Sequence, residues 1–295
     1  MKVLLYINSE LKMKTNNQLV EDLIKNAITE DIGDGDYSSL ACIPKEAKGK
    51  ANLLIKENGI LAGIEIARQV FASIDNSLEV LINKEDGQHI KKGDIILTVS
   101  GKVHSILKSE RLVLNLLQRL SGIATATHLY TSQLEGFSTK ILDTRKTTPG
   151  MRILEKMAVK AGGGVNHRMG LYDMIMLKDN HIDFAGGIKN AISKTKDYLR
   201  KNNLDLDIIV EARNIKEVTE ILENGPIKRI LLDNFSIEQT KEAVQYINGR
   251  TETESSGGIT LHMIKNYAEC GVDFISVGAL THQIKSLDMS LKADF

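Results

Sequence analysis

The sequence predicts an α/β protein whose larger part is an α/β barrel, preceded by a smaller α+β domain. After residue 138, short and nearly continuous apolar runs alternate with helical patterns, as in proteins with parallel sheets. The chain has no GxGxxG or GxxxxGK(S/T) motif, which disfavours a Rossmann or P-loop fold. The first third mixes helical and β-like patterns, which indicates the separate first domain. A length of 295 residues accommodates both parts.

The composition disfavours several classes of function. The 38 Lys and Arg residues balance 38 Asp and Glu residues, so a general nucleic-acid or membrane-surface binder is disfavoured. Two cysteines are too few for a disulfide scaffold or a thiolate metal cluster, and they favour a reducing compartment. No apolar run reaches the ~18 residues of a membrane span, and the run in MKVLLYINSE is too short for a signal peptide. We therefore expect a cytoplasmic protein that binds neither nucleic acid nor membranes.

The first domain begins with a helix, because apolar residues recur at helical spacing from Leu19 to Ile28. Turn-rich EDGQHIKKGD predicts a hairpin connection between the second and third of the β-like runs that follow. A long amphipathic helix is then expected from about Glu110, with Ser109 as its cap. The three β-like runs cover residues 51–55, 78–82 and 94–99.

The predicted barrel consists of six strand-like runs separated by helical patterns. Gly162 ends the first of these helices, and Thr260 caps a later one. Capping boxes are expected at Asn214 with Glu217 and at Ser236 with Gln239. The six runs cover residues 140–146, 173–180, 207–213, 229–234, 250–258 and 273–282.

Charged and small residues follow the predicted strands, and in an α/β barrel the carboxyl ends of the strands share one mouth. Cations gather on the early strands, carboxylates on the middle ones and small residues on the last two. The loop after the first strand adds His167 and Arg168. The residues at the strand ends are Arg145, Lys146, Lys178, Asp179, Glu211, Arg213, Asp233, Asn234, Ser256 and Gly278.

Each group of mouth residues suits a different part of a ligand. Arginine forks bind carboxylates bidentately. Paired acids suit a hard cation such as Mg²⁺ or the hydroxyls of a sugar. Glycine-bearing loops after the last strands let backbone N–H groups approach a phosphate, where barrels commonly bind one. The mouth therefore predicts a carboxylated substrate, a phosphorylated sugar and a metal.

Structural roles are an alternative for several of these residues. Lys178 with Asp179, and Glu211 with Arg213, could form structural ion pairs. The glycines at 162–164 could simply end a helix. For His181 a structural role is favoured over catalysis, and the remaining histidines show no spacing typical of metal ligands.

Several stretches, taken together, resemble the quinolinate phosphoribosyltransferase family, also called carboxylating nicotinate-nucleotide pyrophosphorylases. The resemblance covers essentially the whole chain, and DTRKT, GGGVNHR and KDNH at this spacing are highly specific. It implies an N-terminal α/β sandwich domain (1–115), an incomplete α/β barrel (116–280) and a C-terminal tail that packs on the first domain (281–295). The matching stretches are EDIGDGDYSS, ERLVLNLLQRLSGIATAT, DTRKTTPGMRILEKMAVKAGGGVNHRMGLYDMIMLKDNHI, VEARN, LLDN, ESSGGI and VGALTH.

The resemblance implies an activity: transfer of phosphoribosyl from phosphoribosyl pyrophosphate to quinolinate, giving nicotinate mononucleotide, CO₂ and pyrophosphate, with Mg²⁺, in NAD synthesis. It also implies a homodimer or higher oligomer, in which Arg111 reaches the neighbouring subunit's site. Catalytic roles fall on Lys146, Glu211 and Asp233, the last two also at the metal. The residues implied in substrate binding are Arg111, Arg145, His167, Arg168, Lys178, Ser256, Gly257, Gly258 and Gly278.

Two alternatives use the same fold. An enzyme for nicotinate or another ring acid with one carboxylate would need fewer cations than this mouth supplies. A non-catalytic barrel that senses a phosphorylated metabolite would need the glycine loops, but not Glu211, Asp233 and the basic cluster together. Both alternatives are less favoured than the dicarboxylate enzyme.

Overall fold

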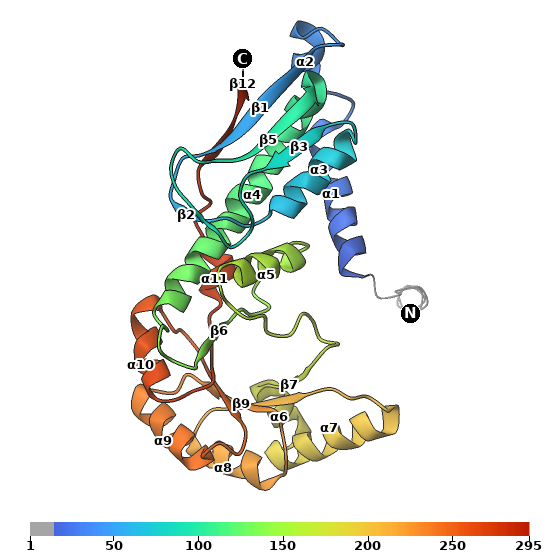
Figure 1. Ribbon diagram of the computed structural model, residues 1–295. Coiled ribbons are helices and arrows are strands. Elements are labelled where there is room, and N and C mark those ends of the chain that lie inside the picture. The colour runs from blue at the N-terminus through green and yellow to red at the C-terminus, as the bar shows by residue number, and fades with distance from the viewer. Residues whose placement is uncertain (1–14, 295) are drawn as a thin grey trace. The chain divides into compact units, whose positions relative to one another are not determined.

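The computed structural model describes residues 15–294, which form two compact units (Figure 1). Among the described residues, the first unit comprises 15–124, 148–161 and 285–294, and the second comprises 125–147 and 162–284. The chain therefore divides elsewhere than at residues 115 and 280, because a segment from the middle of the sequence packs with the N-terminal part. Residues 1–14, which carry the apolar run considered above as a signal peptide, lie outside the described residues, as does residue 295.

The sheet of the first unit is antiparallel, with the strand order β12-β1-β5-β3. Its central strands pair Leu53 with Leu97 and Ala51 with Val99, all of them buried, so their alternate residues form the core. β12 pairs along β1, which brings the C-terminal segment into this sheet. The strands are β1 (Lys48–Ile55), β3 (Glu79–Ile82), β5 (Ile95–Lys102) and β12 (Met289–Asp294), and β2 (Gly59–Ile60) pairs separately with β4 (His89–Ile90).

Helices complete the first unit. The amphipathic pattern near residue 20 is confirmed as α1, which begins with a capping box formed by Thr15 and Gln18. α1 packs against α3 and α5. Arg119 forms an ion pair at 2.6 Å with the fully buried Glu155 of α5, and this contact helps to place α5 in this unit. The helices are α1 (Asn16–Ile32), α2 (Tyr37–Cys42), α3 (Ile64–Ile74) and α5 (Arg152–Ala161).

The long helix α4 (Val103–Ser132) starts earlier than the sequence predicted. The expected start at Ser109 is wrong: Ser109 is fully buried inside the helix, and its Oγ donates to the carbonyl oxygen of Ser105 at 2.8 Å. A serine can satisfy its hydroxyl on the carbonyl four residues earlier, so its presence alone does not mark a helix end. The final part of the helix, from Thr125, belongs to the second unit.

The second unit contains the predicted parallel sheet, with the strand order β6-β11-β10-β9-β8-β7. All six predicted runs contain a strand, so the barrel-like expectation is confirmed, although each strand is shorter than its run. The open order of six strands, with β6 and β7 at the edges, agrees with an incomplete barrel. The strands are β6 (Lys140–Leu142), β7 (Ile175–Leu177), β8 (Ile208–Ala212), β9 (Arg229–Asp233), β10 (Glu252–Ser256) and β11 (Phe274–Ser276).

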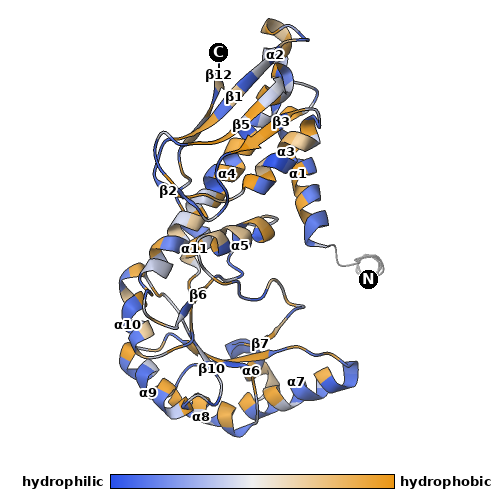
Figure 2. Cartoon of the chain, in the orientation of Figure 1, coloured by the Kyte–Doolittle hydropathy of each residue, from blue (hydrophilic) through white to orange (hydrophobic). Residues whose placement is uncertain are grey.

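Helices on one face of this sheet bury its apolar side. Val210 and Ile230 belong to a core cluster with Ile192, Val218 and Ala243 from the flanking helices. These helices show alternating hydrophobic and hydrophilic stretches in Figure 2, as amphipathic helices do. They are α6 (Asp179–Ala185), α7 (Ile188–Asn202), α8 (Ile215–Glu223), α9 (Ile237–Ile247) and α10 (Ile264–Glu269). The unit also contains the short helix α11 (Ala279–His282) and a 3₁₀ turn η1 (Leu261–Met263).

Helix starts in this unit test the capping predictions. The capping box of Ser236 with Gln239 is confirmed. Asn214 caps α8 by accepting from the Glu217 N–H, but the Glu217 side chain instead accepts from the Arg213 N–H at 2.7 Å. Thr260 precedes η1 without a side-chain capping bond, so that prediction is wrong. Within residues 15–294, no helix has both the length and the apolar character needed to cross a membrane.

Candidate active site

A cavity of about 810 Å³ lies at the carboxyl ends of the parallel strands of the second unit. It brings together all but two of the predicted site residues. Leu231 and Met176 supply apolar surface among the charged groups. The predicted residues that line it are Arg145, Lys146, His167, Arg168, Lys178, Asp233, Ser256, Gly257, Gly258 and Gly278.

Two arginines form a basic wall. Arg168 is only 8% exposed, and its Nη1 donates to the Met174 carbonyl oxygen at 3.1 Å. Burial, and next the positive charge of Arg145, lower the pKa of the Arg168 guanidinium, although the carboxylate of Asp173 acts in the opposite direction. Both guanidinium groups stay charged at neutral pH, so their mutual repulsion would be relieved by a bound anion.

Backbone contacts hold this wall in place. The His167 N–H donates to Asp143 Oδ1 at 2.8 Å, and Asp143 is fully buried after β6. The loop after Arg168 closes on Asp173, whose carboxylate accepts from the N–H groups of Met169 and Gly170 at 2.7 and 2.9 Å. The loop is therefore tied at both ends of the His167–Arg168 pair.

Two carboxylates belong to the middle strands. Asp233 lines the cavity, whereas Glu211 is buried and lies outside the lining residues. Glu211 Oε2 is 3.7 Å from Nζ of Lys178, and Oε1 accepts from the Asp179 N–H at 3.5 Å. Burial, and then the charge of Asp233, raise the pKa of Glu211 above its usual value, and Lys178 opposes them.

These carboxylates fit a hard divalent cation. The charge of Asp233 adds to the cost of ionising Glu211, so a cation beside Glu211 would lower that cost, and oxygen donors are what Mg²⁺ prefers. Among residues 15–294 no group of three or more His, Cys, Asp or Glu side chains is arranged to hold a metal. Glu211 and Asp233 therefore suit an ion that takes its remaining ligands from substrate and water.

The loop after β10 is built for close backbone approach. Gly257 has φ +98°, and a Cβ there would lie 2.2 Å from Oδ1 of Asn234 and 2.8 Å from its backbone nitrogen. Asn234, itself at φ 56°, donates from Nδ2 to Asp233 Oδ2 at 2.7 Å. Parallel register pairs Ser256 with Asp233. The glycine loop and the acidic site thus share one wall.

Lys146 lies against Gly278, the glycine that follows β11. A Cβ on Gly278 would meet Cδ of Lys146 at 3.0 Å and Nε2 of His282 at 3.1 Å. Thr281 Oγ1 donates to the Lys146 carbonyl oxygen at 2.8 Å, so the backbone of Lys146 is held by α11. The absence of a side chain at Gly278 lets the lysine stem cross the end of β11.

Family models decide which proteins share this arrangement. The model described as "Quinolinate phosphoribosyl transferase, C-terminal domain" matches residues 123–292, and the corresponding N-terminal domain model matches residues 36–121. The chain belongs to the quinolinate phosphoribosyltransferase family. The expected family resemblance is therefore confirmed over both units.

Individual relatives support the same assignment. The chain is 46% identical to a chloroplastic carboxylating nicotinate-nucleotide pyrophosphorylase of Arabidopsis thaliana, and the match covers 92% of this chain and 82% of that protein. It is 40% identical to a probable enzyme of the same name from Bacillus subtilis, with 94% of each chain covered. The crystal structure of NadC from Streptococcus pyogenes, 38% identical, aligns with a TM-score of 0.89 over 96% of this chain and 99% of that one.

Besides Glu211, three residues named from the sequence lie outside the cavity lining. Arg213, at a strand end, pairs with Asp183 and Glu217 on the surface, so its role is structural, but its partner is not Glu211 as the alternative held. Asp179 meets Glu211 only through its N–H group. Arg111 lies exposed on α4 among the residues of the first unit, and its role toward a neighbouring subunit stays a prediction.

Two residues that line the cavity, Glu254 and His282, were not predicted from the sequence as site residues. Glu254 is fully buried in β10 and lines the cavity, and His282 follows the last strand. His282 carried a weak signal, since it ends the VGALTH run. For His181 the structural interpretation agrees with the geometry: its Nδ1 accepts from the Lys178 N–H at 3.0 Å.

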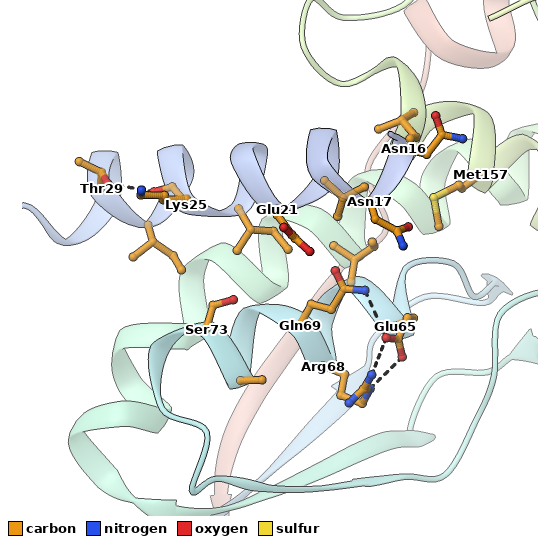
Figure 3. Close-up of a pocket in the computed structure, with 16 residues that line it drawn as sticks. Asn16, Asn17, Glu21, Lys25, Thr29, Glu65, Arg68, Gln69, Ser73 and Met157 are labelled. Atoms are coloured by element: carbon orange, nitrogen blue, oxygen red, sulfur yellow. Dashed lines mark hydrogen bonds and ion pairs between the residues drawn. The ribbon is translucent and has the colours of Figure 1, made fainter. Parts of the chain in front are cut away.

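A second cavity, of about 1030 Å³, lies within the first unit among α1, α3 and α5 (Figure 3). Its most basic group, Arg68, donates to both oxygens of Glu65 at 2.6 and 2.8 Å. Gln69 also donates to Glu65 at 3.2 Å. Glu65 therefore neutralises Arg68 directly, and among the described residues this cavity does not bring two arginines together as the cavity of the second unit does.

Proposed function

We propose that the chain transfers the phosphoribosyl group of phosphoribosyl pyrophosphate to the ring nitrogen of quinolinate, with loss of one carboxylate. The products are nicotinate mononucleotide, CO₂ and pyrophosphate, in NAD biosynthesis. One observation carries the proposal beyond family membership: a single cavity combines the adjacent cations Arg145 and Arg168 with the glycine loop at Gly257. A ring dicarboxylate and a phosphorylated sugar are ligands that such a cavity suits together.

In this proposal the basic wall binds the two carboxylates of quinolinate. Arg145 and Arg168 offer forked donors, and Lys178 adds a third cation beside them. Charged hydrogen bonds of this kind contribute about 1.5–3 kcal/mol each. Three cations exceed what nicotinate, with one carboxylate, would need, so they favour the dicarboxylate. His167 completes the wall that surrounds the ring.

The phosphoribosyl donor occupies the remaining walls. Backbone N–H groups of Ser256, Gly257, Gly258 and Gly278 hold its 5′-phosphate, because glycine allows the anion to come close to the backbone. Lys146, whose stem crosses Gly278, contacts the donor beside that phosphate.

Glu211 and Asp233 serve the reacting centre. As the C1′–O bond to pyrophosphate breaks, positive charge develops at C1′, and the nearby carboxylates stabilise it. The same two residues would hold Mg²⁺, which when bound supplies positive charge against the leaving pyrophosphate. Because burial and Asp233 raise the pKa of Glu211, a cation beside it would stabilise its ionised form.

Positioning accounts for the bond that forms. The basic wall holds quinolinate so that its ring nitrogen attacks C1′ in line, and such positioning alone can lower a barrier by several kcal/mol. The ring nitrogen then carries positive charge, so the electron pair left by the departing CO₂ is stabilised on the adjacent carbon, which takes up a proton. Lys146 is the candidate for delivering that proton; unchanged turnover in Lys146→Ala would remove it from the role.

Product analysis tests the proposal. The purified protein is incubated with phosphoribosyl pyrophosphate, Mg²⁺ and either quinolinate or nicotinate. Nicotinate mononucleotide and CO₂ from quinolinate alone support the dicarboxylate reaction. Product from nicotinate alone would overturn the role given to the basic wall. No product in either reaction from a folded protein would instead favour a sensor of phosphorylated metabolites.

We also propose a homodimer or higher oligomer with shared active sites, in the cytoplasm. Arg111 is exposed and is not among the residues that line the cavity, which supports a role at another subunit's site. Mixing Arg111→Ala with Lys146→Ala subunits should restore activity if sites are shared, and should not if each chain works alone. Both cysteines are free, which supports a reducing compartment.

A further inference from the structure

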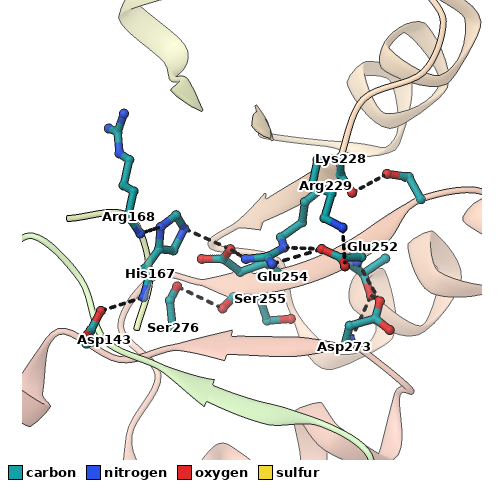
Figure 4. A network of polar contacts seen from close by, with 12 residues as sticks. Asp143, His167, Arg168, Lys228, Arg229, Glu252, Glu254, Ser255, Asp273 and Ser276 are labelled. Carbon is teal, nitrogen blue, oxygen red and sulfur yellow. Dashed lines mark hydrogen bonds and ion pairs between the residues drawn. The ribbon is translucent and has the colours of Figure 1, made fainter. Parts of the chain in front are cut away.

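Buried charges lie behind the basic wall (Figure 4). Register pairs Glu252 with Arg229 and Glu254 with Leu231, so these residues occupy successive layers on one face of the sheet. Such inward positions in barrels usually hold bulky apolar residues, as Leu231 does here with Met176 and Ile209. Charged residues among them need a specific reason.

Glu254 is held as a carboxylate by Arg229. Its side chain is fully buried, and Oε2 accepts from Arg229 Nη1 at 2.9 Å. Burial raises the pKa of Glu254, but hydrogen bonding by His167 and Arg229, together with the charge of Arg229, outweighs burial, so the net pKa is lowered. Arg229 is itself fixed by two bonds to Glu252, at 3.0 and 3.1 Å, and by the ring of Phe274, 3.8 Å from the guanidinium carbon.

Both ring nitrogens of His167 lie against protein groups, Nδ1 in a hydrogen bond and Nε2 in a longer contact. Nδ1 accepts from the Arg168 N–H at 2.7 Å, so this nitrogen carries no hydrogen and the ring N–H is on Nε2. Nε2 lies 3.3 Å from Glu254 Oε2, the oxygen that Arg229 also binds. Figure 4 shows His167 between Arg168 and Glu254. A histidine held in this way faces the protein with both of its polar ring atoms.

We propose that Glu254 is a positioning residue, which fixes His167 as the Nε2–H tautomer and thereby holds the adjacent Arg168 in the cavity wall. The role in catalysis rests on the proposed function, since quinolinate is the ligand that this wall would bind. His167 then contributes shape rather than a hydrogen bond or a proton to the substrate. The cationic contacts to the dicarboxylate come from the arginines and Lys178.

Arg229 explains how a carboxylate can stand so close to an anion site. It neutralises Glu254 directly, so the buried acid orients His167 without presenting an uncompensated negative charge to quinolinate. Glu252, at the start of β10, forms an ion pair with the same guanidinium through Oε2. Its other oxygen, Oε1, forms a partly exposed ion pair with Lys228 at 3.1 Å.

Two substitutions of similar size distinguish the effect of the carboxylate oxygens of Glu254 from the effect of its volume. Glu254→Met removes the acceptor, and we expect the KM for quinolinate to rise roughly tenfold, the equivalent of one lost charged hydrogen bond, with the KM for phosphoribosyl pyrophosphate unchanged. Glu254→Gln keeps an oxygen that can accept from both Arg229 and His167, so it should restore most of the loss. Lys228→Met, at the exposed end of the network, is the control and should leave both KM values unchanged.

Nitrogen-15 spectra of histidine-labelled protein give a readout that does not depend on activity. His167→Gln assigns the signals, and in the wild type Nδ1 should appear unprotonated and Nε2 protonated. The signals should persist in Glu254→Gln and change in Glu254→Met. A wild-type His167 protonated at Nδ1 would overturn the inference even if Glu254→Met does not fold. So would an active wild type with unchanged KM and spectra in Glu254→Met, whereas an inactive wild type would refute only the proposed function.

Discussion

Gly257 and Gly258 are neighbours that differ in what surrounds them, which makes them a matched pair for substitution by alanine. Both have positive φ, +98° and +60°. A Cβ on Gly258 would meet nothing within 4 Å, whereas a Cβ on Gly257 would lie 2.2 Å from Oδ1 of Asn234 and 2.8 Å from its backbone nitrogen. Only Gly257→Ala therefore forces atoms to move.

The expected cost follows from these distances. Gly258→Ala places an alanine in the left-handed region, at a cost of about 1–2 kcal/mol. Gly257→Ala takes a φ outside that region, which costs about 1–3 kcal/mol. It also displaces Asn234 and its bond to Asp233, which adds a further ~1.5–3 kcal/mol for a hydrogen bond to a charged group. We expect Gly257→Ala to be destabilised by roughly 2–3 kcal/mol more than Gly258→Ala, the difference between the midpoints of these sums.

Thermal unfolding without ligand measures this difference, because it removes any effect of a methyl group on phosphate binding. A gap of roughly 2–3 kcal/mol corresponds to about 4–12 °C in Tm for a unit of this size. Equal Tm values for the two variants would refute the reasoning, since they would mean that the loop yields freely and that Asn234 does not support it.

Three further predictions concern the basic wall, the acids and the metal. Arg168→Met should raise the KM for quinolinate by roughly 10- to 100-fold through a lost charged hydrogen bond and leave that for phosphoribosyl pyrophosphate unchanged; an equal rise in both would contradict the assignment. The pKa of Glu211 is higher in the folded protein than in the unfolded chain. As pH rises from the unfolded-state pKa to the folded-state pKa, the unfolded chain loses this proton more readily, so the free energy of unfolding falls. Glu211→Gln should therefore raise Tm at pH 7 but not at pH 4, as scanning calorimetry would show. Chelation of Mg²⁺ should abolish turnover but leave Tm unchanged, because Glu211 and Asp233 need substrate to complete the site; a Tm loss on chelation would argue for a resident structural ion.

Glu254 shows why part of the site could not be predicted. Its sequence context, TETES, is polar at every position, so no apolar residue nearby marks Glu254 as buried. Its partners Arg229 and His167 are 25 and 87 positions away in the sequence, by subtraction of the residue numbers. The early start of α4 was missed for the opposite reason, because Ser109 has a capping residue's chemistry but satisfies its hydroxyl within the helix.

The sequence by itself determined the alternation of strands and helices, the residues at the carboxyl ends of the strands and the family, because these depend on periodicity and on short motifs. Only the tertiary structure decided which strand-end residues face the cavity. Arg145 and Arg168 meet there, whereas Arg213, equally basic and equally placed in sequence, turns to Asp183 and Glu217. The direction of a side chain beyond a strand end depends on the loop and on partners from distant segments, and these come together only when the chain has folded.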